Sequence, residues 1–208
     1  MARTRIKICG IRDAKMAEVA ADAGADAIGL VFHTPSPRYV EPARAAEILA
    51  ALPPWTVAVG LHVDPTLDDF LDIEETCPAP YTQLHGDEPE GLVRRIGPDV
   101  IKYVRYDEAT IDADLKRWGG VDEVCAILVD GSAGGDGVAF DWQQAARPLS
   151  MSKKRIILAG GLTPGNVGEA IRAVRPWAVD VSSGVESSRG VKDAGLVRAF
   201  CAAVHASA

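Results

Sequence analysis

Several short apolar segments of the sequence carry polar or titratable side chains at alternate positions. These alternating pairs are Lys7/Cys9, His62/Asp64, Gln83/His85, Leu128/Asp130 and Asp180/Ser182. In a β-strand, alternate side chains point to the same face, so each pair shares one face. A buried polar group costs roughly several kcal/mol unless it is paired or used. The pattern therefore predicts either ion pairs or a reaction site that contains a thiol, carboxyl groups, an amide and an imidazole.

Two glycine-rich turns near the C-terminal end could bind an anion. The first runs from Ala159 to Asn166 and the second from Ser182 to Glu186. Glycine allows backbone N–H groups to approach an anion, and a helix N-terminus adds its positive dipole end. Each turn alone could simply reverse the chain, but two of them after neighbouring strands favour a phosphate site. We expect Gly160, Gly161, Ser183 and Gly184 to form it.

These residues lie in a chain that alternates short runs rich in Val, Ile and Leu with longer runs rich in Ala, Glu, Arg and Leu. Strands are predicted to begin near Arg5, Asp26, Thr56, Tyr81, Val100, Cys125, Arg155 and Ala178. Helices are predicted over Asp13–Ala23, Pro42–Leu52, Leu67–Thr76, Pro89–Ile96, Glu108–Trp118, Asp141–Ala146, Pro164–Val174 and Lys192–Val204. Thr163 followed by Pro164 is typical of a helix start, with an N-cap and a proline at the first helical position.

Eight strand–helix units predict a single-domain (β/α)8 barrel of eight parallel strands over residues 1–208. An open doubly wound sheet is the alternative, but no G-x-G-x-x-G follows the first strand. In the barrel the polar pairs face the interior at the C-terminal ends of the strands, where barrel active sites form. The pairs Ile6/Ile8, Leu61/Val63, Ile127/Val129 and Val179/Val181 are then expected to face the helices. A glycine-rich segment from Gly131 to Gly137 is expected to be a mobile loop over the site.

Composition narrows the classes of partner. The 22 Lys and Arg against 29 Asp and Glu give a net charge of −7 over 208 residues, which argues against a nucleic-acid partner. No apolar run is long enough to span a membrane, and the start lacks the apolar region of a secretory signal. Four scattered cysteines without a C-x-x-C motif predict neither a disulfide framework nor a zinc site. We therefore expect a cytoplasmic protein without a bound metal.

Six motifs, in order, resemble one family over essentially the whole chain. They are Lys7–Ile11, Ser36–Tyr39, Gln83–Gly86, Leu128–Gly131 continuing through Gly134–Gly137 to Phe140–Trp142, Gly160–Leu162 with Asn166–Val167, and Asp180–Glu186 followed by Gly190 and Lys192–Asp193. The sequence is similar to phosphoribosylanthranilate isomerases of tryptophan biosynthesis. That resemblance implies an Amadori rearrangement of N-(5-phosphoribosyl)anthranilate to 1-(2-carboxyphenylamino)-1-deoxyribulose 5-phosphate, without a cofactor or metal.

The resemblance also implies roles for individual residues. Asp130 is expected to be the general acid that opens the furanose ring, and Cys9 the general base that takes the proton from the sugar C2. Desolvation is expected to raise the pKa of Asp130, and positive charge from Lys7 to lower the pKa of Cys9. Arg38 corresponds to the position expected to hold the anthranilate carboxylate.

Other interior residues are expected to contact the substrate. Gln83 and His85 are predicted to line the pocket, although a structural histidine remains an alternative. Lys7 and Asp180 lie on neighbouring strands and form either a structural ion pair or substrate contacts. Departures from the family pattern at Arg12-Asp13, His62, Lys102, Tyr103, Arg105 and Gly131 place His62, Tyr103 and Arg105 near the barrel mouth. The family contains both monomers and homodimers.

Two alternatives remain. Isomerases of histidine biosynthesis and indole-glycerol-phosphate synthase are also phosphosugar barrels, but their strand-end Asp or Lys/Glu sets are absent here. A barrel that binds a phosphate ligand without catalysis would need the glycine turns but neither Cys9 nor Asp130. Consumption of the fluorescent substrate distinguishes an enzyme from such a binding module.

Overall fold

Eight parallel strands close into a barrel in the computed structural model, which describes residues 3–131 and 140–207. Each strand pairs with the next along the chain, and β8 pairs with β1. The strands are β1 (Arg5–Cys9), β2 (Ala27–Val31), β3 (Val57–His62), β4 (Tyr81–Leu84), β5 (Val100–Arg105), β6 (Val124–Asp130), β7 (Arg155–Leu158) and β8 (Ala178–Val181). The predicted (β/α)8 fold is confirmed. The predicted loop at 131–137 lies outside the described residues, apart from Gly131.

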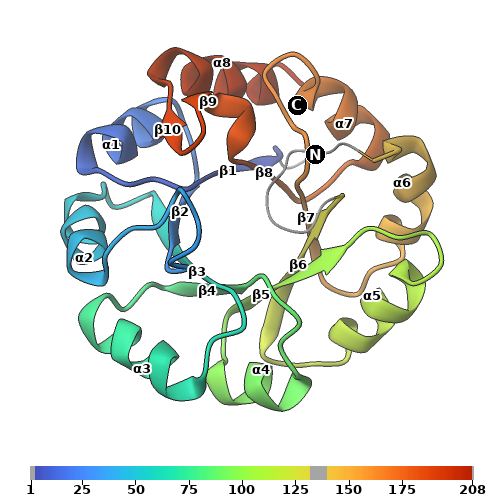
Figure 1. Ribbon diagram of the computed structural model, residues 1–208. Helices are drawn as coiled ribbons and strands as arrows, with labels where there is room; N and C mark the ends of the chain where they lie inside the picture. The colour runs from blue at the N-terminus through green and yellow to red at the C-terminus, as the bar shows by residue number, and fades with distance from the viewer. Residues whose placement is uncertain (1–2, 132–139, 208) are drawn as a thin grey trace.

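The helices form a ring around the strands (Figure 1). They are α1 (Ala14–Asp22), α2 (Pro42–Ala51), α3 (Leu67–Thr76), α4 (Glu90–Ile96), α5 (Ile111–Gly119), α6 (Trp142–Ser150), α7 (Val167–Val174) and α8 (Ala194–His205). The predicted end of the sixth helix at Ala146 is wrong, because the helix continues past Pro148 to bury Leu149. None of the helices within the described ranges has the length and apolar character needed to cross a bilayer.

A short hairpin separates the last strand from the last helix. After β8 the chain forms a 3-10 turn, η1 (Ser183–Val185), followed by the antiparallel strands β9 (Glu186–Ser188) and β10 (Val191–Lys192). Figure 1 shows this hairpin beside α8 at the rim of the barrel. The sequence predicted a helix from Lys192, so the hairpin delays the helix to Ala194. Asp193 then caps α8, since its carboxylate accepts a hydrogen bond from the Leu196 amide.

The barrel has an apolar layer on each side of the sheet. Ile6, Ile8, Ile127, Val129, Val179 and Val181 pack toward the helices, as their alternation predicted. Val59, Ile101, Tyr103, Ala126, Leu128, Ile157, Ala159 and Ala178 form a separate interior cluster. The predicted orientation is wrong for the third strand, because Leu61 and Val63 pack in the interior against Cys9 and Val31.

His62 consequently faces the helix layer and not the barrel mouth. Its ring lies 5.2 Å from the ring of Phe32 and 5.2 Å from the ring of Phe70 in α3, so it packs as an aromatic side chain. Its Nε2 is buried without a hydrogen-bond partner among the described residues. Burial lowers the pKa of His62 to about 4, which keeps the ring neutral in the folded protein at neutral pH.

The His62→Leu variant should lose less stability on acidification than the wild type. The folded-state pKa lies below the unfolded-state value, so the unfolded chain binds more protons as pH falls through 6.5 toward 4. Removing this histidine should reduce the loss of unfolding free energy between pH 8 and pH 5 by about 2 kcal/mol. Urea unfolding at both pH values measures the difference. His205→Gln, which replaces an exposed histidine at the end of α8, is the control. If it reduced the loss of unfolding free energy as much as His62→Leu does, this explanation would be contradicted.

Candidate active site

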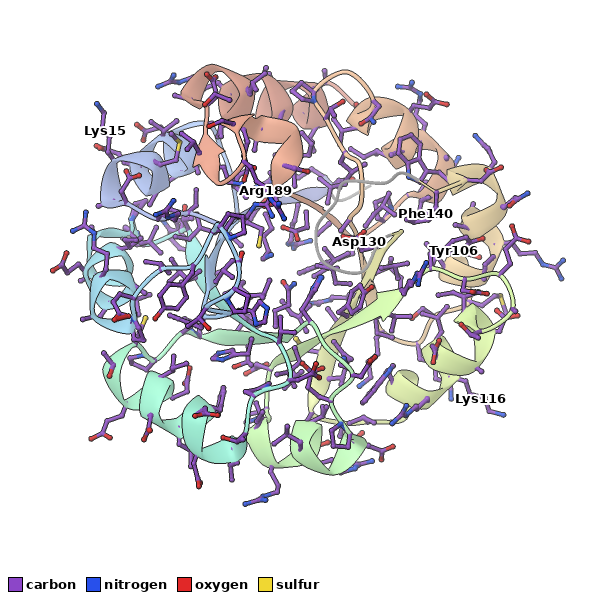
Figure 2. All side chains as sticks on the ribbon, viewed as in Figure 1. Lys15, Tyr106, Lys116, Asp130, Phe140 and Arg189 are labelled. Atoms are coloured by element: carbon purple, nitrogen blue, oxygen red, sulfur yellow. The ribbon has the colours of Figure 1, made fainter. Side chains whose placement is uncertain are left out.

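A cavity of about 480 Å³ opens at the C-terminal ends of the strands. Its lining includes Cys9, Arg38, Gln83, His85, Asp130 and Asp180, so one cavity brings together six residues that the sequence predicted for a site. Cys9 ends β1 and Asp130 ends β6, on opposite sides of the barrel. Figure 2 shows Asp130 at the end of its strand near the barrel axis. Both residues are nearly buried, with 5% and 6% of their surface exposed.

Lys7 and Asp180 form a buried ion pair beneath Cys9. The Lys7 Nζ lies 2.9 Å from the Asp180 Oδ1, and their side chains are only 3% and 8% exposed. Burial alone would lower the pKa of Lys7, but Asp180 and Cys9 raise it above its usual value. Lys7 therefore stays charged, and the ion pair that the sequence offered as one alternative for these two residues is formed.

The expected lowering of the Cys9 pKa is not found. Burial raises the pKa of the Cys9 thiol above its usual value, because desolvation outweighs the opposing effects of Lys7 and Lys192. The contribution of Lys7 has the predicted direction, but it is too small to reverse the net shift. Gly29 leaves room for this thiol, since a Cβ there would lie 2.7 Å from the Cys9 Sγ.

Arg38 is held by a carboxylate that the sequence did not assign to the site. The Arg38 Nε donates to the Glu186 Oε1 at 2.7 Å, and the Arg38 Nη2 donates to the Glu186 Oε2 at 3.0 Å. Lys192 Nζ also donates to Glu186 at 2.7 Å and to both oxygens of Ser182. Burial opposes ionisation of Glu186, but hydrogen bonds from Arg38 and Lys192 lower its pKa to about 2. Glu186 thus links the β2–α2 loop to the hairpin.

Replacing Glu186 with glutamine should destabilise the protein at neutral pH. Because the folded-state pKa lies below the unfolded-state value, this carboxylate stabilises the fold above about pH 4.5. That contribution disappears as the pH falls toward 2. We expect a loss on the order of 2 kcal/mol at pH 7 that shrinks below pH 4.5. Urea unfolding across this range tests it, and a loss independent of pH would refute the electrostatic explanation.

Gln83 and His85 meet on the interior face of β4. The Gln83 Nε2 lies 2.9 Å from the His85 Nδ1, and the His85 ring stacks on Tyr103 with centroids 4.1 Å apart. Burial, aided by Lys7 and Lys102, lowers the pKa of His85 to about 3, so the imidazole is neutral. With the amide donating to Nδ1, the ring proton lies on Nε2. His85 can therefore donate one hydrogen bond from Nε2 without carrying a charge.

The two glycine-rich turns pack against each other after β7 and β8. A Cβ at Gly184 would lie 1.9 Å from the carbonyl oxygen of Leu162, so only glycine permits this contact. Gly160 and Gly161 both have positive φ, at 86° and 64°. The amides of Gly160, Gly161, Ser183 and Gly184 donate no hydrogen bond to any described residue. These four N–H groups can therefore bind an anion.

Asn166 braces the first of these turns. Its Oδ1 accepts from the Thr163 amide at 2.7 Å, and its Nδ2 donates to the Gly161 carbonyl at 2.9 Å. The predicted helix start at Thr163-Pro164 is therefore wrong. Asn166 is the N-cap residue, and α7 begins at Val167.

Three positions of the fifth strand that depart from the family pattern lie in different surroundings. Tyr103 lines the mouth cavity as expected, whereas Arg105 lines a neighbouring cavity between β5 and α5. Lys102 faces outward, where its Nζ lies 2.7 Å from Glu88 in a buried ion pair.

Within the described ranges, no three His, Cys, Asp or Glu side chains cluster in a way that could hold a metal ion.

The chain is similar in sequence to known phosphoribosylanthranilate isomerases over nearly its whole length. Residues 6–203 match the family model described as N-(5'phosphoribosyl)anthranilate (PRA) isomerase. The N-(5'-phosphoribosyl)anthranilate isomerase of Pseudomonas aeruginosa (strain LESB58) is 45% identical over 208 residues, covering 98% of this chain and 96% of that protein.

Solved structures agree with the sequence comparison. A phosphoribosyl anthranilate isomerase in complex with reduced 1-(o-carboxyphenylamino)-1-deoxyribulose 5-phosphate is 36% identical, with a TM-score of 0.86 and coverage of 98% of this chain and 99% of that one. A structure described as monomers of the dimeric enzyme from Thermotoga maritima is 35% identical, with a TM-score of 0.86 and the same coverage. The barrel, the cavity and these relatives together show that the chain belongs to the phosphoribosylanthranilate isomerase family.

Proposed function

We propose that the chain converts N-(5-phosphoribosyl)anthranilate into 1-(2-carboxyphenylamino)-1-deoxyribulose 5-phosphate, an aldose–ketose isomerisation of tryptophan biosynthesis. The observation that carries this proposal is a single cavity lined by Cys9, Asp130 and Arg38, in a chain of this family. Its volume of about 480 Å³ suits a ligand of this size. The product analogue bound in a solved relative is the same kind of molecule.

In the first step Asp130 acts as the general acid. Its carboxyl proton passes to the furanose ring oxygen while the bond between that oxygen and C1 breaks. The nitrogen lone pair then forms a C1=N double bond, which gives the open-chain Schiff base. Asp130 ends β6 at the cavity and is nearly buried, with 6% of its surface exposed.

In the second step Cys9 acts as the general base. Its thiolate takes the C2 proton, the C–H electron pair forms C1=C2, and the imine electrons return to nitrogen. The resulting enol becomes the ketone when C1 takes up a proton and the C2 hydroxyl loses one, and these two transfers return Cys9 to the thiolate and Asp130 to the acid. Every electron stays within the substrate, so the rearrangement needs no external oxidant or reductant. Lys7 and Lys192 favour the thiolate electrostatically, in opposition to burial.

The substrate is anionic at both ends, and each end has a candidate partner. The phosphate would be bound by the backbone amides of Gly160, Gly161, Ser183 and Gly184, and the anthranilate carboxylate by Arg38. Gln83 orients His85, whose neutral Nε2–H can donate to a sugar oxygen. The Lys7–Asp180 pair would lie under the sugar, next to Cys9.

The proposed activity fits one location, one domain organisation and one class of partner. We infer a cytoplasmic enzyme, folded as one domain over residues 1–208, that acts on a small molecule without a nucleic-acid or membrane partner. It would be a monomer or a homodimer; the Thermotoga maritima relative is described in both forms.

A fluorescence assay tests the proposed function directly. The purified protein should consume N-(5-phosphoribosyl)anthranilate, and the loss of anthranilate-type emission reports turnover. No turnover, despite tight binding of the reduced product analogue, would favour a binding module over an enzyme.

A further inference from the structure

Arg189 reaches over the candidate active site from the turn of the β9–β10 hairpin. Its side chain lines the same cavity as Cys9 and Arg38, and the residue is exposed. Figure 2 shows Arg189 extending from the hairpin toward the barrel axis. The sequence pattern predicted no role for this residue.

The other basic side chains around this part of the cavity already have carboxylate partners. Arg38 and Lys192 both pair with Glu186, and Lys7 pairs with Asp180. Lys192 is also buried, and its amine donates to two oxygens of Ser182. By contrast, Arg189 forms no ion pair with any residue in the described part of the chain. Its guanidinium is available for an incoming anion.

The hairpin turn is fixed against the loop that carries Arg38. The amide of Gly190 donates to the Glu186 Oε2 at 3.0 Å, and a Cβ at Gly190 would lie 2.5 Å from the Pro37 carbonyl oxygen. Arg12 Nη1 donates to the Pro37 carbonyl at 3.3 Å and lies 3.5 Å from that of Gly190. Arg189 is therefore anchored on the side of the cavity where Arg38 lies.

Glu186 weakens the attraction that Arg38 alone can exert on a carboxylate ligand. It accepts hydrogen bonds from Nε and Nη2 of Arg38, and its negative charge offsets the guanidinium. Arg38, Lys192 and Glu186 together carry one net positive charge, so a further cation at the cavity would strengthen the attraction for an incoming carboxylate. Arg189 supplies that charge with a planar group suited to carboxylates.

We propose that Arg189 binds the aromatic carboxylate of the substrate together with Arg38, and so contributes to selection for an ortho-carboxylated amine. This inference rests on the proposed function. The pair would contact opposite sides of one carboxylate, while the phosphate is held separately by the glycine turns.

Two probe ligands test this assignment. One is reduced 1-(o-carboxyphenylamino)-1-deoxyribulose 5-phosphate, and the other is the same molecule without its carboxylate. We expect Arg189→Gln to weaken binding of the first about 5- to 10-fold and to change binding of the second less than about twofold, as for one exposed charge-assisted hydrogen bond. Arg189→Lys keeps the charge but loses the planar group, so its loss should be intermediate.

Arg198→Gln provides the matched control, because this exposed arginine lies on the outer helix α8. It should bind both ligands as the wild type does. Equal weakening of both ligands by Arg189→Gln, or unchanged binding of the carboxylated one, would overturn the assignment. A wild type that binds neither ligand and consumes no substrate would instead refute the proposed function, and this inference with it.

Discussion

The Asp130→Asn variant should lose about 10²- to 10⁴-fold in kcat, the range that general acid catalysis contributes. Asparagine has nearly the shape of aspartate but cannot release a proton to the furanose ring oxygen. Asp130 ends β6 and is nearly buried, so no bulk water can easily replace it as the acid. The fluorescence assay with N-(5-phosphoribosyl)anthranilate measures the loss.

Binding separates this chemical defect from a folding defect. The Asp130→Asn protein should bind the reduced product analogue within about threefold of the wild type, because the two glycine turns and Arg38 are unchanged. Wild-type turnover in this variant would mean that another group opens the ring. An unfolded variant would be recognised by its lost cooperative thermal transition.

The Cys9→Ser variant should show a loss of similar size, about 10²- to 10⁴-fold in kcat. A serine hydroxyl fits the space beside Gly29, but it ionises far less readily than a thiol. Because burial raises the pKa of Cys9 and the base acts as the thiolate, wild-type kcat/KM should increase with pH through the neutral range. The serine variant should lose that increase.

Cys125→Ser is the matched control for the thiol. Cys125 lies in β6 and lines a cavity at the N-terminal end of the barrel, away from Cys9. This variant should retain wild-type kcat and the same dependence on pH. Wild-type activity in Cys9→Ser, or an equal loss in Cys125→Ser, would remove Cys9 from the role of general base.

Much of the fold could be predicted because repeated local patterns determine it. Alternating apolar runs located all eight strands. The alternation of side chains along a strand also correctly predicted that Ile6, Ile8, Ile127 and Val129 face the helices. The predicted interior position of His62 was wrong, because a neutral imidazole packs between Phe32 and Phe70 much as an aromatic ring does. Polarity in the sequence does not distinguish that histidine from one that faces a cavity.

The sequence could predict several of the residues that line the candidate site, but not which of them form ion pairs with one another. Cys9 and Asp130, predicted from the ends of two strands, line one cavity, and the two predicted glycine turns pack against each other. The bond between Arg38 and Glu186 joins residues 148 positions apart, across a hairpin with no strong local signal. The net shift of the Cys9 pKa depends on the balance between burial and two lysines, which spacing along the chain does not reveal.

A deuterium isotope effect at the sugar C2 tests the division of labour between Asp130 and Cys9 most directly. Turnover of normal and C2-deuterated N-(5-phosphoribosyl)anthranilate is compared in both variants. Residual turnover of Cys9→Ser should show a primary isotope effect, because removal of the C2 proton limits its rate. Asp130→Asn should show none, because ring opening limits it first. A primary effect in Asp130→Asn, or none in Cys9→Ser, would contradict the assigned roles.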